Sequence, residues 1–431
     1  MIKALRNCNV FKYFQNNALS ELIRHYFVYL FGLGVLGLLS LFVIPFIVRI
    51  FGTKVYGEFT LIQNIILISI SFISGWLNQS ILRFNNKTLY FKNAIYILFI
   101  LSILPIFLLF ASYTVIKGVD VILVLLLFPI VIYGGYFAVK ISFFQSENEP
   151  LKAVGFDLIR VFSNILVILI LFYLIEYKSL YVLFIAMFLS YLIPVVAFQN
   201  KFKIKYLSLF KIDYFKNQLS KNINLLNYSL PLALWFVFSS LLNVADRYVI
   251  SIYCNYQVVG EYSAVYDLIN KIVILLFSPF LVAGYPLIAR EYNNGNRINV
   301  ISLLKKIIVY ELILFVVSFL FFYYFGFDLL FRILNLKGNE FNRIAYLIFI
   351  GTFLWQLAMV AHKPLELMLK TKVMVYIVIL SLFVNLVINV VFIKKFGVVV
   401  AGYSTVLSAI IYLVVVVVYV YSKNIKSNNR V

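Results

Sequence analysis

Long apolar runs separated by short polar segments fill almost the whole chain. Each run has roughly the 20 residues that a helix needs to cross a bilayer. The pattern therefore predicts an all-α integral membrane protein with about twelve transmembrane helices. The predicted spans are about 26–48, 60–82, 94–116, 121–144, 154–175, 179–198, 225–245, 262–285, 303–325, 344–366, 373–393 and 398–421.

The longest polar connection, residues 199–224, lies between the sixth and seventh runs and carries six lysines against one aspartate. It divides the chain into a predicted N-terminal six-helix lobe, 26–198, and a predicted C-terminal six-helix lobe, 225–421. Residues 1–25 and 422–431 are then short segments outside the lobes. The predicted fold class is two six-helix bundles joined by a basic linker.

Composition agrees with a membrane protein. Apolar residues make up 64% of the chain and charged residues 12%, whereas charged residues approach a quarter of a soluble domain. The formal charge of +21 is scattered between the apolar runs, which is typical of membrane topology and argues against nucleic-acid binding. Two cysteines and two histidines indicate neither a disulfide framework nor a metal site.

The distribution of lysine and arginine predicts the orientation. Of the 37 such residues, 24 fall on the side of the N-terminus and 10 on the opposite side, with the other three inside spans. Cytoplasmic loops carry the excess of basic residues. We therefore expect both termini in the cytoplasm.

One short stretch recurs in the chain. Val55–Thr60 (VYGEFT) returns as Val258–Ser263 (VVGEYS), and a fainter copy, Val400–Thr405 (VAGYST), lies near the end. Each copy sits between two apolar runs, and a glycine can end a helix or let the chain turn. The copies are therefore predicted to cap helix hairpins on the outer face, as in two parallel six-helix repeats.

Acidic residues in or beside the spans are candidates for ion coupling, because charge inside a bilayer is costly unless it faces protein or water. Asp267 and Lys271 stand four apart and can pair, either as a structural ion pair or in a cavity. Glu311 has no partner nearby in sequence, so it could exchange a proton or stay protonated. Asp246 and Arg247 are predicted to close the seventh helix on the outer side, as interfacial anchors or with one facing inward.

Basic residues in or near the spans are candidates for substrate binding. Each alone is an ordinary residue of the positive side of a membrane protein, but together they would line a cationic cavity between two facing lobes. Such a cavity favours an anionic solute, and arginine binds phosphate through its planar fork. The candidates are Arg83, Lys140, Arg160, Arg247, Lys271 and Arg290.

Several motifs resemble one family. Leu226–Pro231 (LNYSLP), Asp246–Tyr248 (DRY) and Val259–Ala264 (VGEYSA) look like the seventh and eighth helices of the polysaccharide-repeat flippases, the O-antigen or Wzx type. The beginning of the chain also resembles this family, in Arg49–Gly52 (RIFG), in Tyr56–Phe59 (YGEF) and in the Arg-Phe pair that closes the second run. The end of the chain resembles it in the spacing of Asn385, Asn389, Gly397 and Gly402. The resemblance covers almost the whole chain.

This resemblance implies the superfamily of multidrug and toxin extruders and lipid II flippases, with two bundles forming a V around a central cavity. It implies translocation of an undecaprenyl-pyrophosphate-linked oligosaccharide across the bacterial cytoplasmic (inner) membrane, for O-antigen, lipopolysaccharide, capsule or exopolysaccharide assembly. Access to the cationic cavity would alternate between the two sides of the membrane, driven by an ion gradient or the membrane potential, with no bound cofactor. Membrane lipid and the polymerase and chain-length proteins of the pathway are the implied partners. Arg83, Asp246 and Arg247 match the family motifs, whereas Lys140, Arg160, Lys271 and Glu311 match none.

Two alternatives remain open. A multidrug or cation exporter of the same fold would need acidic rather than basic residues in its cavity. A membrane enzyme such as a polysaccharide polymerase would need a large outer loop, whereas the largest polar connection here is predicted to be cytoplasmic. We therefore expect a transporter rather than an enzyme, and the chain has no phosphate-binding GxxxxGK[ST] loop.

Overall fold

The computed structural model of the chain describes residues 18–83, 121–147, 149–175, 179–198, 223–336 and 339–428. Regular structure in these residues is helical, which confirms the predicted all-α fold class. The helices of the N-terminal part are α3 (Ala18–Arg83), α6 (Val121–Ser146), α7 (Pro150–Ile175) and α8 (Leu180–Ala197). The predicted linker 199–224 lies mostly outside the described residues.

The C-terminal part contains more helices, several of them short. They are α10 (Ile223–Leu242), α11 (Ala245–Tyr253), α12 (Tyr256–Asn293), α13 (Arg297–Phe321), the π-helix η2 (Phe322–Gly326), α14 (Phe327–Leu334), α15 (Asn339–Ala361), α16 (Lys363–Leu367), α17 (Thr371–Phe396) and α18 (Val399–Asn428).

Ten helical segments among the described residues are long and apolar enough to cross a membrane. The first, Gly34–Gly75, has 42 residues, or about 60 Å at 1.5 Å per residue, which is twice the thickness of the hydrocarbon core. It covers two of the predicted spans, because the helix is broken at Gly52. The predicted count of twelve is not confirmed, since the third span, 94–116, lies outside the described residues.

Helix α17 shows how the sequence is matched to lipid. Tyr376 and Phe383 are 71% and 64% exposed, and they lie on one side of the helix because seven residues make about two turns. Asn385 and Asn389 are buried on the other side, where Ser404 of α18 hydrogen-bonds both. Apolar residues therefore face the hydrocarbon and polar residues are satisfied inside the protein, as a bilayer requires.

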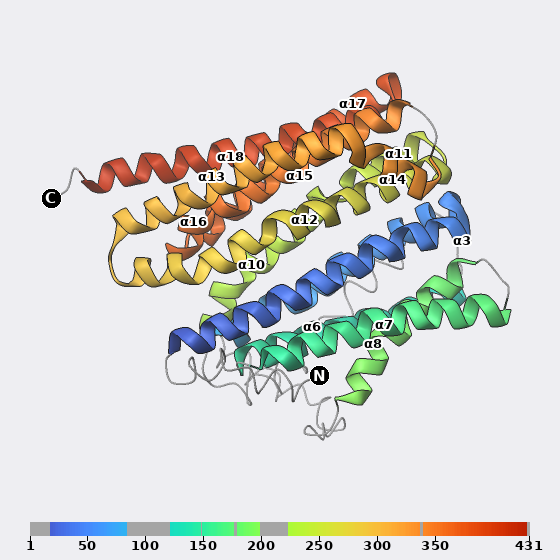
Figure 1. Cartoon of the computed structure of the whole chain (residues 1–431), viewed down its shortest axis with the longest axis horizontal. Helices are drawn as coiled ribbons and strands as arrows, with labels where there is room; N and C mark the ends of the chain where they lie inside the picture. The colour runs from blue at the N-terminus through green and yellow to red at the C-terminus, as the bar shows by residue number, and fades with distance from the viewer. Residues whose placement is uncertain are drawn as a thin grey trace.

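The helices run roughly parallel and form two groups (Figure 1). The N-terminal group contains α3, α6, α7 and α8, and the C-terminal group contains the helices from α10 to α18. We call them the N-lobe and the C-lobe. Helix α3 lies between them, because it packs on α6 and α7 of its own lobe and on α10 and α12 of the other.

The repeated stretch marks one end of the bundle, but its glycines do not make the turns. Gly57, Gly260 and Gly402 lie within helices, so the prediction that these glycines end a helix or turn the chain is wrong. The breaks lie five residues earlier, at Gly52 (φ 83°), Asn255 (φ −79°, ψ 165°) and Gly397 (φ 77°). Positive φ favours glycine at two of these positions. We call the end with these three turns the repeat end; the turn between α12 and α13 and the C-terminus lie at the opposite end (Figure 1).

Candidate functional site

The seventh predicted helix is broken inside the bundle. Helix α10 ends at Leu242, residues 243–244 form a turn, and α11 continues to Tyr253. The apolar segment therefore extends beyond the predicted end at 245, and Asp246 and Arg247 lie within it with 1% and 2% exposure. The prediction that this pair closes the helix as interfacial anchors is wrong, because both side chains are enclosed by protein.

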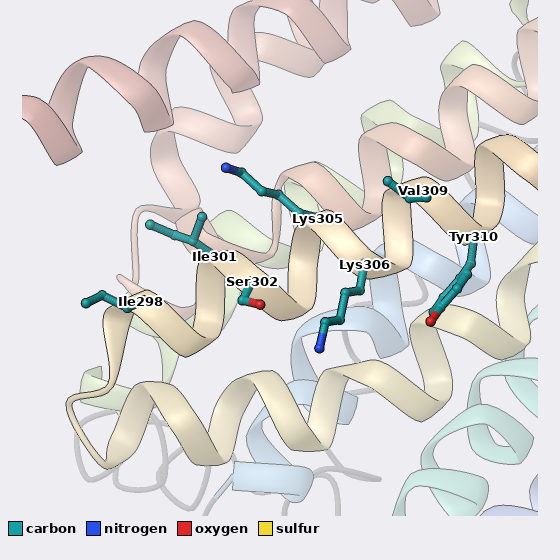
Figure 2. Close-up of a pocket in the computed structure, with 7 residues that line it drawn as sticks. All are labelled: Ile298, Ile301, Ser302, Lys305, Lys306, Val309 and Tyr310. Carbon is teal, nitrogen blue, oxygen red and sulfur yellow. The ribbon is translucent and has the colours of Figure 1, made fainter.

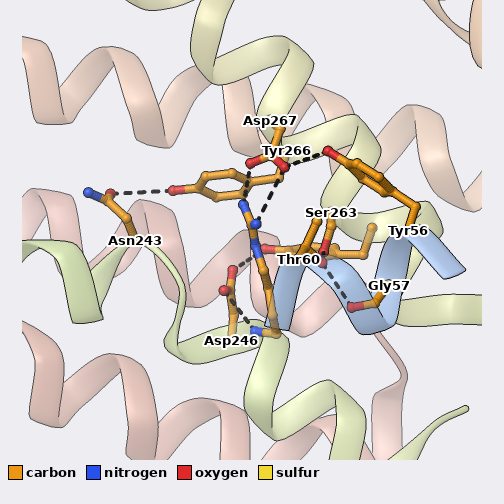
Figure 3. Close-up of polar contacts among 10 residues, drawn as sticks. Tyr56, Gly57, Thr60, Asn243, Asp246, Ser263, Tyr266 and Asp267 are labelled. Carbon is orange, nitrogen blue, oxygen red and sulfur yellow. Dashed lines mark hydrogen bonds and ion pairs between the residues drawn. The ribbon is translucent and has the colours of Figure 1, made fainter. Parts of the chain in front are cut away.

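Arg247 makes an ion pair with Asp267 of α12. Its Nη2 lies 2.6 Å from Asp267 Oδ1 and its Nη1 lies 3.4 Å from Oδ2, and the guanidinium stacks over the ring of Tyr266. The hydroxyl of Tyr56, on α3, donates to Asp267 Oδ2 at 2.9 Å. Figure 3 shows these side chains converging from both lobes. Asp267 is therefore a carboxylate shared between an arginine of its own lobe and a tyrosine of the other.

Asp246 is held separately. Its Oδ1 accepts the backbone N–H of Arg247 at 2.9 Å, and its Oδ2 accepts the hydroxyl of Tyr262 (Figure 3). Two donors satisfy this buried carboxylate, which lowers the cost of enclosing it. Arg247 Nε, by contrast, is buried and no described residue hydrogen-bonds it.

Lys271 lies one helical turn beyond Asp267. The two were expected to be able to pair, but Asp267 pairs with Arg247 instead. The Lys271 side chain is exposed to solvent, yet protein surrounds it closely, and Arg160 and Asp157 of α7 are within electrostatic range. Arg160 and Asp157 form their own ion pair at 2.7 Å. An exposed lysine of the C-lobe thus lies within electrostatic range of a charged pair of the N-lobe.

Lys140 is placed differently from the other candidate cations. It is 3% exposed, and its Nζ donates to the carbonyl oxygen of Phe198 at 2.8 Å, just beyond the end of α8. A cation at a helix C-terminus satisfies the terminal carbonyls and the helix dipole. Its ammonium also lies over the rings of Tyr136 and Phe156. The predicted role in substrate binding stays a prediction, and the observed contacts are internal to the N-lobe.

We expect Lys140→Met to destabilise the N-lobe by about 1–3 kcal/mol, since it leaves the Phe198 carbonyl without its charged donor. Heat-induced aggregation of the detergent-solubilised protein measures this, and Lys152→Met at an exposed i,i+3 pair is the control, with an expected change below about 1 kcal/mol. Equal stability of the two variants would contradict the capping role.

The remaining candidates are scattered. Arg290 is exposed near the end of α12, at the turn to α13. Arg83 is the last residue of α3, and its side chain lies outside the described part of the structure. Glu311 is 1% exposed on α13, and its Oε2 has no hydrogen-bond partner among the described residues. Arg83, Arg290 and Glu311 thus lie apart from the cluster around Asp267.

A hollow of about 440 Å³ lies on the surface of α13 (Figure 2). Its lining is Ile298, Ile301, Ser302, Lys305, Lys306, Val309 and Tyr310. All seven residues belong to one helix and none to the N-lobe. The hollow is therefore separate from the charges that the two lobes share.

Sequence reasoning missed several members of the site. Tyr56 and Tyr262 were treated only as parts of the repeat, and Asp157 was not selected. A signal existed for Asp157, which lies three residues before Arg160 within an apolar run, the spacing of a helical ion pair. Only the tertiary structure pairs Arg247 with Asp267, because 20 residues and a turn separate them.

Comparisons with known proteins agree with this architecture. The family model described as polysaccharide biosynthesis protein matches residues 22–292. No curated protein sequence gives a significant match. Among solved structures, the lipid II flippase MurJ in an inward closed conformation has 16% identity and a TM-score of 0.69, with 93% of this chain and 87% of that chain covered.

Two further solved structures share the fold. A MATE transporter variant from Vibrio cholerae has 14% identity and a TM-score of 0.64, covering 95% of this chain and 97% of that one. A MOP superfamily transporter from Pyrococcus furiosus has 11% identity and a TM-score of 0.58, covering 96% and 98%.

These matches confirm the resemblance drawn from the sequence motifs. The solved structures that share this fold include a lipid II flippase and multidrug transporters, and the apolar helices indicate a multi-pass membrane protein. The chain belongs to the polysaccharide biosynthesis protein family and has the fold shared by MATE transporters and MurJ.

Proposed function

We propose that the protein flips an undecaprenyl-pyrophosphate-linked oligosaccharide repeat unit across the bacterial cytoplasmic membrane. The observation that carries this proposal is the exposed Lys271 of the C-lobe, which lies within electrostatic range of Arg160 of the N-lobe. Two cations on facing lobes are suited to an anionic group between them, and pyrophosphate is the anionic group of such a substrate. The family match supports the oligosaccharide part of the proposal.

The physical task explains the arrangement. A sugar and a pyrophosphate must cross about 30 Å of hydrocarbon, while the polyprenyl chain can stay in the lipid outside. A solvated, cationic path between lobes lowers the cost for the polar part, as in transporters whose sites lie between two repeats. Asp157 beside Arg160 and Asp267 beside Lys271 limit the net positive charge, so the substrate is not held too tightly to leave.

The proposed orientation places the repeat end outside and both termini in the cytoplasm, on the distribution of lysine and arginine. Delivery to the outer leaflet would then supply polymerase and chain-length partners for O-antigen, lipopolysaccharide, capsule or another surface polysaccharide. An ion gradient or the membrane potential would supply the energy. The alternative is an ion-coupled exporter of another solute of the same charge. The gene-deletion experiment described below distinguishes this exporter from a flippase.

Among the three acidic candidates, Glu311 is best suited to couple transport to protons. Asp246 and Asp267 have hydrogen-bond donors or an ion-pair partner, whereas Glu311 Oε2 is buried and has no partner within the part of the chain that the structure describes. In such surroundings the neutral, protonated form of a carboxyl group costs less free energy than the charged form. Taking and releasing a proton there would change the charge buried in the C-lobe and so bias its conformation.

We expect Glu311→Gln to leave stability unchanged or slightly raised, because the amide is as polar as the protonated acid and carries no charge. Export should fall and lose its dependence on the proton gradient, as measured with and without an uncoupler. Glu340→Gln, at an exposed position on α15, is the control for the same change of side chain where no coupling role is proposed. Gradient-dependent export at the original rate in Glu311→Gln would exclude the coupling role.

The proposal itself is tested by deleting the gene and extracting undecaprenyl-linked material. We expect a complete repeat unit that externally added glycosidase or lectin cannot reach in intact spheroplasts. Accumulation of an accessible single repeat would point to polymerisation instead. If no lipid-linked material accumulates, the protein exports another solute.

A further inference from the structure

The two stronger copies of the repeated stretch contact each other across the lobes. Thr60 Oγ1 and Ser263 Oγ lie 3.3 Å apart, and the residues are separated by 203 positions, which is also the offset between the copies. In a pair related by two-fold symmetry, a residue meets its own equivalent only at the axis. The pseudo-two-fold axis relating these two copies therefore passes through this contact.

Gly57 and Gly260 lie at the same crossing. A Cβ atom added at Gly57 would lie 2.7 Å from Gly260 N, and one added at Gly260 would lie 2.9 Å from Gly57 N. The added atoms would also overlap the carbonyl oxygens of Tyr256 and Thr53. The backbones of α3 and α12 are thus in direct contact, which small residues permit between membrane helices.

Hydrogen bonds on both sides of the crossing join the lobes. Tyr56 donates to Asp267 at 2.9 Å, and Tyr248 of α11 donates to the carbonyl oxygen of Leu61 at 2.8 Å. At the very end of the bundle, Arg49 Nε donates to the carbonyl oxygen of Ile333 at 2.8 Å, near the C-terminus of α14. All three bonds, like the glycine contact, lie on the repeat-end side of Lys271.

We infer that the two repeat copies form a self-complementary gate that closes the transport path at the repeat end. Gly260 precedes Lys271 on α12 by 11 residues, or about 16 Å of helix, so the contact separates that end from the proposed anion site. Release of the substrate there requires the glycine contact and the Tyr56–Asp267 hydrogen bond to separate. The inference rests on the proposed transport function.

The gate is tested by joining its two halves. In a Cys8→Ser, Cys254→Ser background, Thr60→Cys with Ser263→Cys makes small changes to side chains already in contact. We expect oxidation to link them, as shown by peptide mass mapping without reductant, and export of the lipid-linked oligosaccharide to fall at least tenfold until reductant is added. The matched control is Gly32→Cys with Val154→Cys, where a Cβ at Gly32 would lie 3.2 Å from Val154 Cβ.

The control links α3 to α7 within the N-lobe, so export should continue after it is oxidised. Export that continues with the Thr60–Ser263 link formed would overturn the gate, and so would failure of that link to form while the control link does. Link formation does not depend on what is transported. If the gene-deletion strain accumulates no lipid-linked material, the proposed substrate is wrong, whereas formation of the Thr60–Ser263 link would still show that the two copies are in contact.

A second variant covers the case in which the cysteine pair fails to insert. Gly260→Ala places a methyl group against the Thr53 carbonyl, so the closed form should lose population. We expect the single cysteine of Ser263→Cys to react at least tenfold faster with a membrane-impermeant maleimide added outside when Gly260→Ala is present. Gly155→Ala, whose added Cβ meets nothing within 4 Å, should leave the rate unchanged, and equal rates in all three proteins would refute the gate.

Discussion

Replacing Arg247 by alanine is expected to destabilise the protein by about 1.5–3 kcal/mol, more than an exposed ion pair contributes, because the arginine is buried, and less than a fully buried pair, because Asp267 is a quarter exposed. The guanidinium is enclosed by protein, and it is the ion-pair partner of Asp267. After the change Asp267 keeps the neutral hydroxyl of Tyr56 as its one hydrogen-bond donor among the described residues. We expect the detergent-solubilised variant to aggregate at a clearly lower temperature and to reach the membrane in reduced amounts.

A double-mutant cycle identifies the cause. Arg247→Ala with Asp267→Ala removes both charges, so the double variant should be more stable than Arg247→Ala alone. Arg160→Ala is the matched control, since its ion pair with Asp157 is about a quarter to a third exposed and should contribute about 1 kcal/mol or less. Equal losses of stability in the Arg160 and Arg247 variants would show that burial does not determine how much an ion pair contributes to stability.

Replacing Lys271 by glutamine is expected to reduce export about 10- to 150-fold while the protein still inserts normally. The estimate follows from a charge-assisted hydrogen bond to phosphate, worth about 1.5–3 kcal/mol. Lys271 has no ion-pair partner of its own within 4 Å among the described residues, so its removal leaves no buried charge. The readout is the amount of lipid-linked oligosaccharide that reaches the outer leaflet, normalised to the amount of protein in the membrane.

Two variants show whether charge and position both matter. Lys271→Arg keeps the cation and should retain most of the export. Lys305→Gln removes an exposed lysine from the α13 surface (Figure 2), away from the N-lobe, and should export normally. Unchanged export in Lys271→Gln would remove this residue from the proposed anion site.

The sequence predicted the fold class because the bilayer imposes a simple rule on each span. Apolar runs of sufficient length mark the helices, and polar residues within them, such as Asn385 and Asn389, are satisfied by hydrogen bonds to a neighbouring helix, here α18. The break between α10 and α11 could not be predicted, because residues 243–244 contain neither proline nor glycine. Tertiary packing overrides local preference there and moves Asp246 and Arg247 into the interior.

The sequence predicted which residues belong to the candidate site better than it predicted which residues they contact. Lys271, Arg160 and Asp267 were selected because charge within a span needs a reason. Helical spacing suggested Lys271 as the ion-pair partner of Asp267, since side chains four residues apart are neighbours on a helix. The geometry instead pairs Asp267 with an arginine from the next helix and a tyrosine from the other lobe. Contacts between helices depend on how the lobes pack, which spacing within one helix does not record.

The meeting of Gly57 with Gly260 has a consequence for how the two halves of the chain can diverge. A side chain on either glycine would overlap the backbone of the facing segment, so neither position can enlarge while the two segments stay packed. A duplicated segment is ordinarily free to drift once each copy has its own neighbours. Here the copies are each other's neighbours, and the crossing ties the evolution of the first half of the protein to that of the second.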